Sequence, residues 1–138
     1  MSLMNNTDGK RYFSWKEVED LVDILHSNII ESHFKIDHIY GIPRGGLIPA
    51  VLLSHKMNIP LTNYMYTKNT LIIDDICDSG KTLEDVLSDN PTAVLHYKSH
   101  TSRSTPDLYA SKFNSDDWII YPWELKDSKT IQDYKLDK

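Results

Sequence analysis

The sequence predicts an α/β fold with a central, mainly parallel β-sheet flanked by helices. Two segments support this prediction, because each reads as a strand, a glycine turn and then a helix: residues 37–57 and residues 71–88. The second strand begins as a continuous apolar run, which is typical of a strand buried within a parallel sheet. Strands that alternate with helices predict such a sheet, with helices covering it. A chain of 138 residues is expected to form one domain with a sizeable core.

Composition narrows the class of protein. The formal net charge of −5 argues against a general nucleic-acid binder, which usually carries a basic stripe. We find no apolar run long enough to span a membrane and no signal peptide. The single cysteine, Cys77, fits a reducing compartment and is expected to be a small buried filler rather than a catalytic thiol. These features predict a cytoplasmic protein without nucleic-acid or membrane partners. The six histidines lack metal-ligand spacing and are expected at the surface.

The N-terminal third is expected to supply packing rather than chemistry. Residues 1–12 are polar and are predicted to be loose. Ser14 and Glu17 form the pattern of a capping box, in which each side chain binds the backbone of the other residue. Apolar residues then recur at helical spacing and predict an amphipathic helix over 14–32: Val18, Leu21, Val22, Leu25 and Ile29.

A strand over 37–42 leads into the turn Pro43-Arg44-Gly45-Gly46 and a helix over 47–57. Proline is tolerated in the first turn of that helix, where Pro49 lies. Two glycines allow the backbone to approach an anion closely, and Arg44 adds a permanent positive charge. A tight turn with a solvent-facing arginine would produce the same pattern.

Further elements complete the chain. Strands are expected over 59–65, from residue 71, over 92–97 and over 108–113, followed by an apolar segment at 116–124. Only residues 66–70 separate the first two of these strands, which predicts a tight turn.

The stretch from Leu71 to Leu83 carries the strongest functional signal. Three apolar residues run into Asp74 and Asp75, and Asp78 then opens a Ser-Gly-Lys-Thr turn before a predicted helix over 81–88. Ligands of open α/β sheets bind outside the carboxyl ends of the strands, and a glycine turn that opens a helix suits a phosphate. The acidic residues suggest one of three roles: binding a metal, accepting hydrogen bonds from sugar hydroxyls, or accepting a proton. Together they point to a phosphorylated sugar with a divalent cation.

Two ordinary interpretations compete with that one. A nucleotide-binding P-loop would end in Gly80-Lys81-Thr82, but its first glycine would stand at position 75, where the chain has an aspartate. A purely structural acidic turn is the other alternative, since Asp and Ser are common in turns. Three carboxylates within five positions repel one another, however, and an unliganded turn has no use for that repulsion.

The Leu71–Leu83 stretch resembles the signature of type I phosphoribosyltransferases, which bind 5-phosphoribosyl-1-diphosphate (PRPP). The resemblance implies that fold with a small C-terminal hood, in one domain over 1–138: a core at about 14–97, the hood at about 98–124 and a polar tail over 125–138. It implies that Mg²⁺ accompanies PRPP, with Asp75 the first candidate for the metal and Glu124 a second. It also implies a non-proline cis peptide at Pro43–Arg44 or Arg44–Gly45.

The same resemblance assigns PRPP-binding roles by position. The 5′-phosphate would bind Asp78, Ser79, Gly80, Lys81 and Thr82. The ribose hydroxyls would face Asp74 and Asp75, and the diphosphate would lie near Arg44 and Gly45. Related enzymes usually carry a longer flexible lid where this chain has residues 66–70, so full closure of a lid is not expected here.

The segment from Trp118 to Glu124 is similar to the hood of the small xanthine-guanine and hypoxanthine phosphoribosyltransferases. By this resemblance Trp118 would stack on a purine, the backbone at Ile119 would contact the ring edge, Lys98 would reach the 6-oxo group and Asp78 would accept the N7 proton. A flat purine favours an aromatic face, and a 6-oxo group favours a cationic donor. The alternative is that Trp118 is a core aromatic residue and that Lys98 extends past it to solvent.

These features predict transfer of the 5-phosphoribosyl group from PRPP to guanine, xanthine or hypoxanthine in purine salvage, by a homo-oligomer, either a dimer or a tetramer. Alternatives are a regulatory protein that senses nucleotides or PRPP with little catalysis, and a phosphoribosyltransferase for another base. The negative net charge disfavours a nucleic-acid-binding regulator.

Overall fold

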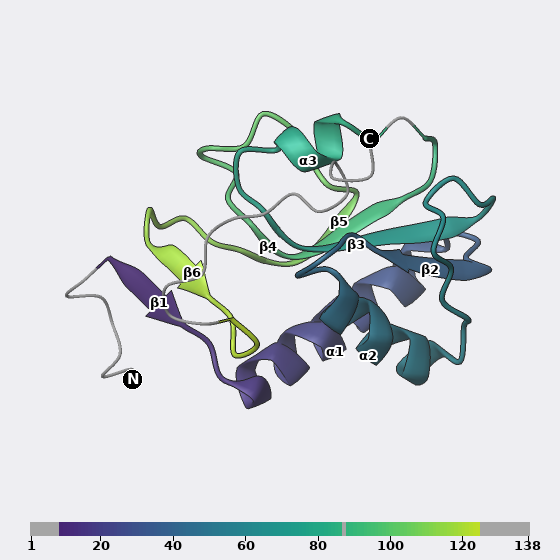
Figure 1. The fold of residues 1–138 in the computed structure, drawn as a ribbon, viewed down its shortest axis with the longest axis horizontal. Helices are drawn as coiled ribbons and strands as arrows, with labels where there is room; N and C mark the ends of the chain where they lie inside the picture. Colours follow the sequence, from purple (N-terminus) through teal and green to yellow (C-terminus); the bar gives the residue numbers. More distant parts are fainter. Residues whose placement is uncertain (1–8, 87, 125–138) are drawn as a thin grey trace.

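A computed structural model describes residues 9–86 and 88–124 of the chain (Figure 1). In order, its elements are β1 (Lys10–Tyr12), α1 (Trp15–Ser32), β2 (His38–Gly41), α2 (Leu47–Met57), β3 (Thr70–Cys77), α3 (Lys81–Glu84), β4 (Thr92–Tyr97), β5 (Leu108–Lys112) and β6 (Trp118–Ile120). The predicted capping box is present at the start of α1, where Ser14 and Glu17 bind each other's backbone N–H. No described helix is long and apolar enough to span a membrane.

The main sheet has the strand order β2-β3-β4-β5, and every neighbouring pair is parallel. Gly41 lies opposite Ile73, and Ile73 lies opposite Ala93. The carboxyl ends of these strands therefore share one edge. The predicted α/β class with a mainly parallel sheet is confirmed. Residues 108–112, which fall within the range predicted for the hood, form the fourth strand of this sheet.

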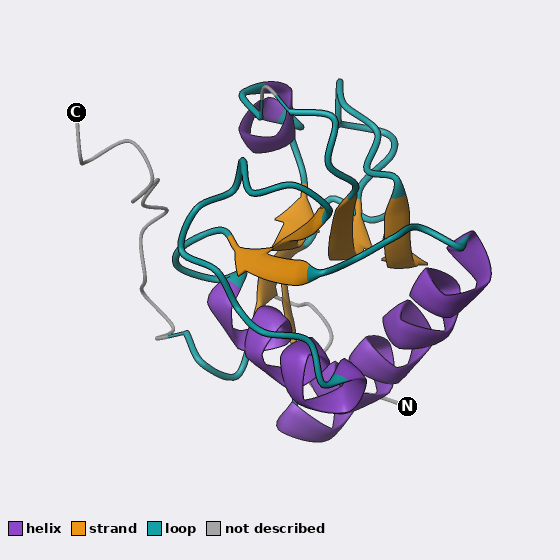
Figure 2. Cartoon of the chain, turned by 90° about the vertical axis from the view of Figure 1, so that its right-hand side faces the viewer, coloured by secondary structure: helices purple, strands orange, loops and turns teal. Residues whose placement is uncertain are grey.

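Helices cover both faces of the main sheet unequally. Helices α1 and α2 lie together on one face, below the sheet in Figure 1 and in Figure 2. Their apolar side chains form the core with those of β2, β3 and β4, for example Leu25, Leu53 and Ile73. On the other face, Leu83 of the short α3 packs against a small cluster around Cys77, which is buried as predicted.

A second, two-stranded sheet forms apart from the main one. Strand β1 pairs in parallel with β6, with Lys10 opposite Trp118 and Tyr12 opposite Ile120 (Figure 1). The backbone N–H of Trp118 also donates to the carbonyl of Gly9 at 2.8 Å. The prediction that residues 1–12 are loose is therefore wrong for residues 10–12, because a strand more than 100 positions away orders them.

Two predicted elements are shorter than expected. The strand over 59–65 is reduced to a single bridge between Leu61 and Ile39, because Tyr64 N–H bonds to the hydroxyl of Thr62 and turns the chain away. The helix over 81–88 ends at Glu84, where the N–H of Asp85 is shared between the carbonyls of Lys81 and Thr82. Such shared bonds are common at helix ends. Position 87 lies outside the described residues.

The connection between α2 and β3 is held at the amino ends of the strands. Asn69 donates to the carboxylate of Asp37, just before β2, at 3.0 Å. Asn90, just before β4, donates to the carbonyls of Met65 and Thr67 at 3.1 and 2.9 Å. This connection therefore lies at the edge opposite the loops that carry Arg44 and Asp78, and it offers no lid for them.

Candidate active site

The predicted functional residues come together at the carboxyl edge of the main sheet. Loop 42–46 follows β2, loop 78–82 follows β3, and segment 98–104 follows β4. Because these strands are neighbours and parallel, their following loops are adjacent. Parallel pairing thus gathers Arg44, Asp78 and Lys98, which are far apart in the sequence.

Glycines let loop 42–46 lie directly on β3. A Cβ at Gly46 would stand 2.4 Å from the carbonyl oxygen of Ile73, and a Cβ at Gly45 would stand 2.0 Å from the carboxylate of Asp75. Both distances are shorter than a van der Waals contact, so a side chain at position 46 would clash with the backbone of β3, and one at position 45 would displace the Asp75 carboxylate. The peptide bond Pro43–Arg44, one of the two bonds predicted, is cis.

Asp74 and Asp75 form a largely buried carboxylate pair in the second half of β3. Asp74 is 9% exposed, and its Oδ1 accepts the N–H of Asp75 at 2.9 Å. Burial, together with the nearby charge of Asp75, raises the pKa of Asp74 well above its ordinary value, and burial also raises the pKa of Asp75. Such a pair favours a ligand that supplies hydroxyl donors or a cation.

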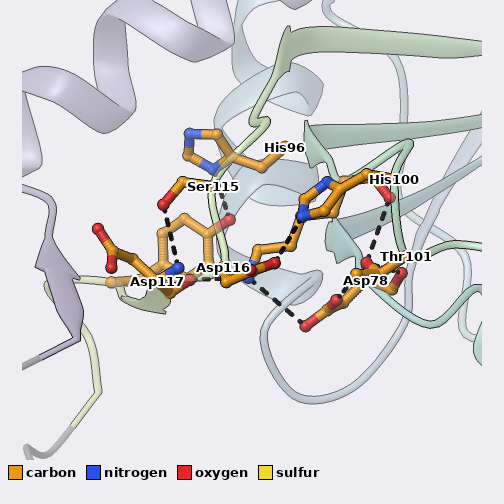
Figure 3. Close-up of polar contacts among 9 residues, drawn as sticks. Asp78, His96, His100, Thr101, Ser115, Asp116 and Asp117 are labelled. Atoms are coloured by element: carbon orange, nitrogen blue, oxygen red, sulfur yellow. Dashed lines mark hydrogen bonds and ion pairs between the residues drawn. The ribbon is translucent and has the colours of Figure 1, made fainter.

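Segment 101–104 lies against loop 78–82 and forms hydrogen bonds with it. The hydroxyl of Thr101 donates to Oδ1 of Asp78 at 2.9 Å (Figure 3), and the N–H of Arg103 donates to the carbonyl of Ser79 at 3.0 Å. Ser104 donates to the carbonyl of Gly80 at 2.6 Å. Sequence reasoning identified this segment only as a polar loop, because nothing local indicates that it packs against residues more than 20 positions earlier.

Lys98 lies between Asp78 and Asp117. Its Nζ donates to the backbone carbonyl of Asp117 at 2.7 Å and lies 3.8 Å from Oδ2 of Asp78. The residue is only 4% exposed, so it does not extend to solvent as the alternative interpretation required. Trp118, next to Asp117, is 48% exposed, whereas Ile119 is buried. Trp118 is therefore accessible and directly follows the residue whose carbonyl accepts a hydrogen bond from Lys98.

Sequence reasoning missed His96 and Tyr121, which lie behind the site. The prediction that the histidines are at the surface is wrong for His96, which is 1% exposed and bonded to the Tyr121 hydroxyl through Nδ1 at 2.7 Å. Its ring packs against Phe13 and Phe113. The available signal was its place inside an apolar strand of a parallel sheet, where both faces are covered.

Burial of His96 should make the protein sensitive to acid. Burial lowers the pKa of His96 to about 4, so between that value and its ordinary value of 6.5 the unfolded chain binds the proton and the folded chain does not. Stability is therefore lost as the pH falls from 6.5 towards 4. Relative to His96→Asn, the wild type should lose about 3 kcal/mol of unfolding free energy across this range.

Urea titrations of both proteins at several pH values would measure this loss. Asp74 and Asp75 act in the opposite direction, because their raised pKa values let the folded chain bind protons first. Both proteins share that contribution, so it cancels in the difference. Stabilities that change in parallel with pH would contradict the prediction.

The carboxylates at this edge fit a cation that arrives with its substrate. No group of three potential His, Cys, Asp or Glu ligands occurs within residues 9–86 and 88–124. Mg²⁺ in proteins is usually held by one or two carboxylates plus substrate phosphates, which suits Asp75 and Glu124. Glu124 accepts the N–H of Tyr121 at 2.8 Å; burial and the charge of Asp75 raise its pKa, while Arg44 opposes the shift.

Curated proteins similar in sequence to this chain include several named xanthine-guanine phosphoribosyltransferase. No family model matches the sequence. The xanthine-guanine phosphoribosyltransferase of Cereibacter sphaeroides is 30% identical over 114 residues, which are 63% of this chain and 68% of that protein. The enzyme of the same name from Chromohalobacter salexigens is 28% identical over 81% of this chain and 82% of its own length.

Structural comparison agrees with the sequence comparison. The crystal structure of a purine phosphoribosyltransferase from Pyrococcus horikoshii superposes with a TM-score of 0.74 at 30% identity, covering 89% of this chain and 99% of that one. The similarity therefore spans the main sheet and most of the remaining chain.

Proposed function

We propose that this chain, which belongs to the purine phosphoribosyltransferase family, transfers the 5-phosphoribosyl group from PRPP to a 6-oxopurine: guanine, xanthine or hypoxanthine. The products are the nucleoside monophosphate and diphosphate. A cytoplasmic site of action suits these metabolites and the reduced state of the buried Cys77.

The buried position of Lys98 is the observation that favours a 6-oxopurine as the substrate. Its Nζ lies near both Asp78 and the carbonyl of Asp117, and the next residue, Trp118, is half-exposed. An oxygen at purine C6 accepts a hydrogen bond from an ammonium group, whereas the amino group of adenine does not offer such an acceptor. Stacking on Trp118 would hold the ring in the same place.

The remaining residues of the site each bind a different part of PRPP. Backbone groups of loop 78–82 hold the 5′-phosphate, Asp74 and Asp75 accept hydrogen bonds from the ribose hydroxyls, and Arg44 with the backbone at Gly45 holds the diphosphate. Asp75 and Glu124 are the residues that would hold Mg²⁺, which when bound supplies charge neutralisation for the diphosphate. Glycine at position 45 leaves room for this arrangement, because a side chain there would displace Asp75.

The chemistry follows glycosyl transfer. Departure of diphosphate builds positive charge on the ribose ring, and the purine N9 attacks C1. Arg44 stabilises the leaving anion. Asp78 accepts the proton from purine N7, and its Oδ1 is oriented for this by the Thr101 hydroxyl.

A spectrophotometric assay with PRPP and Mg²⁺ tests the proposal. The wild type should use at least one 6-oxopurine in preference to adenine. Asp78→Asn should lower turnover at least tenfold, because a general base typically contributes about 100-fold or more. Asp89→Asn is the matched control, since Asp89 is exposed at the opposite edge of the sheet. Binding of PRPP without turnover of any base would instead favour a PRPP sensor.

A further inference from the structure

A buried hydrogen-bonded chain joins the hood to the paired aspartates. Tyr121, just after β6, is 2% exposed, and its hydroxyl donates to the backbone carbonyl of Asp75 at 3.1 Å. Nδ1 of His96 lies 2.7 Å from the same hydroxyl; His96 and this contact are drawn in Figure 3. These hydrogen bonds therefore connect His96 of β4, Tyr121 of the hood and Asp75 of β3.

If both contacts of the Tyr121 hydroxyl are hydrogen bonds, their directions follow. A phenol has one hydrogen, and a backbone carbonyl can only accept, so the Tyr121 hydrogen goes to Asp75. Nδ1 of His96 must then carry a hydrogen and donate to Tyr121. Burial keeps the His96 ring neutral at pH 7 by lowering its pKa to about 4, and it raises the pKa of Tyr121 well above its ordinary value. Both groups thus keep these roles at neutral pH.

Asp75 depends on this chain because its peptide group lacks a strand partner. The register pairs Ile73 with Gly41 and Ile76 with His96, and no residue of the described neighbouring strands is paired with Asp75. Its N–H is satisfied by the Asp74 carboxylate and its carbonyl by Tyr121. A buried peptide group without such partners would be costly, so the side chains set its orientation.

Tyr121 is equally tied to the hood. Its N–H donates to the carboxylate of Glu124 at 2.8 Å, and its ring stacks on Trp123 with centroids 4.8 Å apart and planes within 5°. The residue thus contacts both the segment after β6 and Asp75 on the predicted ribose side of the site. A change at its hydroxyl should reach Asp75 while leaving the ring packing in place.

We propose that Tyr121, oriented by His96, is a positioning residue that holds Asp75 for the ribose hydroxyls of PRPP. The proposal rests on the function proposed above. It adds two residues, Tyr121 and His96, to which that function assigned no contact with substrate. Its role is to fix the peptide that carries the Asp75 side chain, which itself lies against Gly45.

The experiment measures PRPP affinity, with Mg²⁺ and without purine, by isothermal titration calorimetry. Tyr121→Phe removes only the hydroxyl, and His96→Leu removes the donor. Each should weaken PRPP binding roughly three- to tenfold, the range for one net hydrogen bond. His96→Asn can present an N–H where Nδ1 stood and should restore affinity. Tyr109→Phe, on the other face of the sheet, is the control and should bind normally.

The double variant Tyr121→Phe/His96→Leu should bind no worse than Tyr121→Phe alone, because both changes break one chain. In the wild type, ¹⁵N NMR of His96 should report protonated Nδ1 and bare Nε2 at neutral pH. The opposite tautomer would overturn the proposal. Equal PRPP affinity in all variants, or equal losses in His96→Asn and His96→Leu, would do so as well.

These outcomes are separable from a failure of the proposed function. A wild type that binds PRPP but transfers it to no purine contradicts the proposed transfer, while the affinity comparison still decides the role of Tyr121. A wild type that does not bind PRPP overturns both. If His96→Leu does not fold, Tyr121→Phe retains the ring and its packing and decides the question.

Discussion

Replacing Lys98 with methionine should raise the KM for a 6-oxopurine about 100-fold and reduce the preference for 6-oxopurines over adenine. Losing one partner of a buried, hydrogen-bonded charge interaction typically costs about 2–5 kcal/mol, and about 1.4 kcal/mol corresponds to a factor of ten. Methionine has a similar length but no donor, so the purine O6 would meet an apolar group. The KM for PRPP should change little, because Lys98 lies on the hood side of Asp78.

The fold should tolerate this substitution at a moderate cost. Methionine leaves the carbonyl of Asp117 without its donor, which typically costs about 1–3 kcal/mol, whereas the Asp78 side chain is 38% exposed and can be solvated. The melting temperature therefore separates a loss of recognition from a loss of structure. Lys112→Met is the matched control, since Lys112 ends β5 and is exposed. An unchanged purine KM in Lys98→Met, or the same rise in Lys112→Met, would contradict the assignment of Lys98 to the base.

Replacing Gly45 with alanine should lower kcat/KM about 100-fold without unfolding the protein. The new Cβ would lie 2.0 Å from Oδ2 of Asp75, so this carboxylate must swing away from the ribose and metal site. A displacement of about 1 Å in an active site can cost about 100-fold in rate. The clash involves only the end of a side chain, so the backbone can stay in place. Steady-state kinetics and the melting temperature would measure both effects.

Gly46→Ala is the matched contrast to this substitution. A Cβ there would meet backbone atoms of Ile42 and Ile73 at 2.4 to 2.8 Å, which cannot rotate away. This variant should lose stability, about 1–3 kcal/mol for overpacking of this kind. Equal unfolding in Gly45→Ala and Gly46→Ala, or full activity in Gly45→Ala, would show that Gly45 does not serve Asp75 in the way we infer.

Local signals in the sequence predicted most of the fold correctly. The capping box at Ser14 and Glu17, the helix that follows it and the strand–turn–helix units around Gly45 and Gly80 are all present. Each depends on residues within a few positions of one another, where spacing alone states the geometry. The strand predicted over 59–65 failed because a side-chain hydrogen bond from Tyr64 N–H to Thr62 overrides its extended pattern.

The residues of the candidate site also differ in how well the sequence predicted them. Its motif residues, such as Asp74, Asp75 and Asp78, stand together in the chain, and their spacing alone indicates their chemistry. Their supporting residues carry no such local signal: Thr101 beneath Asp78 and Tyr121 behind Asp75 lie 23 and 46 positions from their partners. Thr101 belongs to no motif, and Tyr121 stands in the hood segment at a position to which the resemblance assigned no role.

The sequence by itself determined the class of fold and the identity of the groups that we propose to meet the substrate, because periodicity and motif spacing are local properties. Only the tertiary structure decided that β1 pairs with β6, that His96 is buried and neutral, and that Lys98 lies between Asp78 and Asp117. Those features arise where parallel strands bring distant loops to one edge. There, burial determines which polar groups must find partners and which charges can persist.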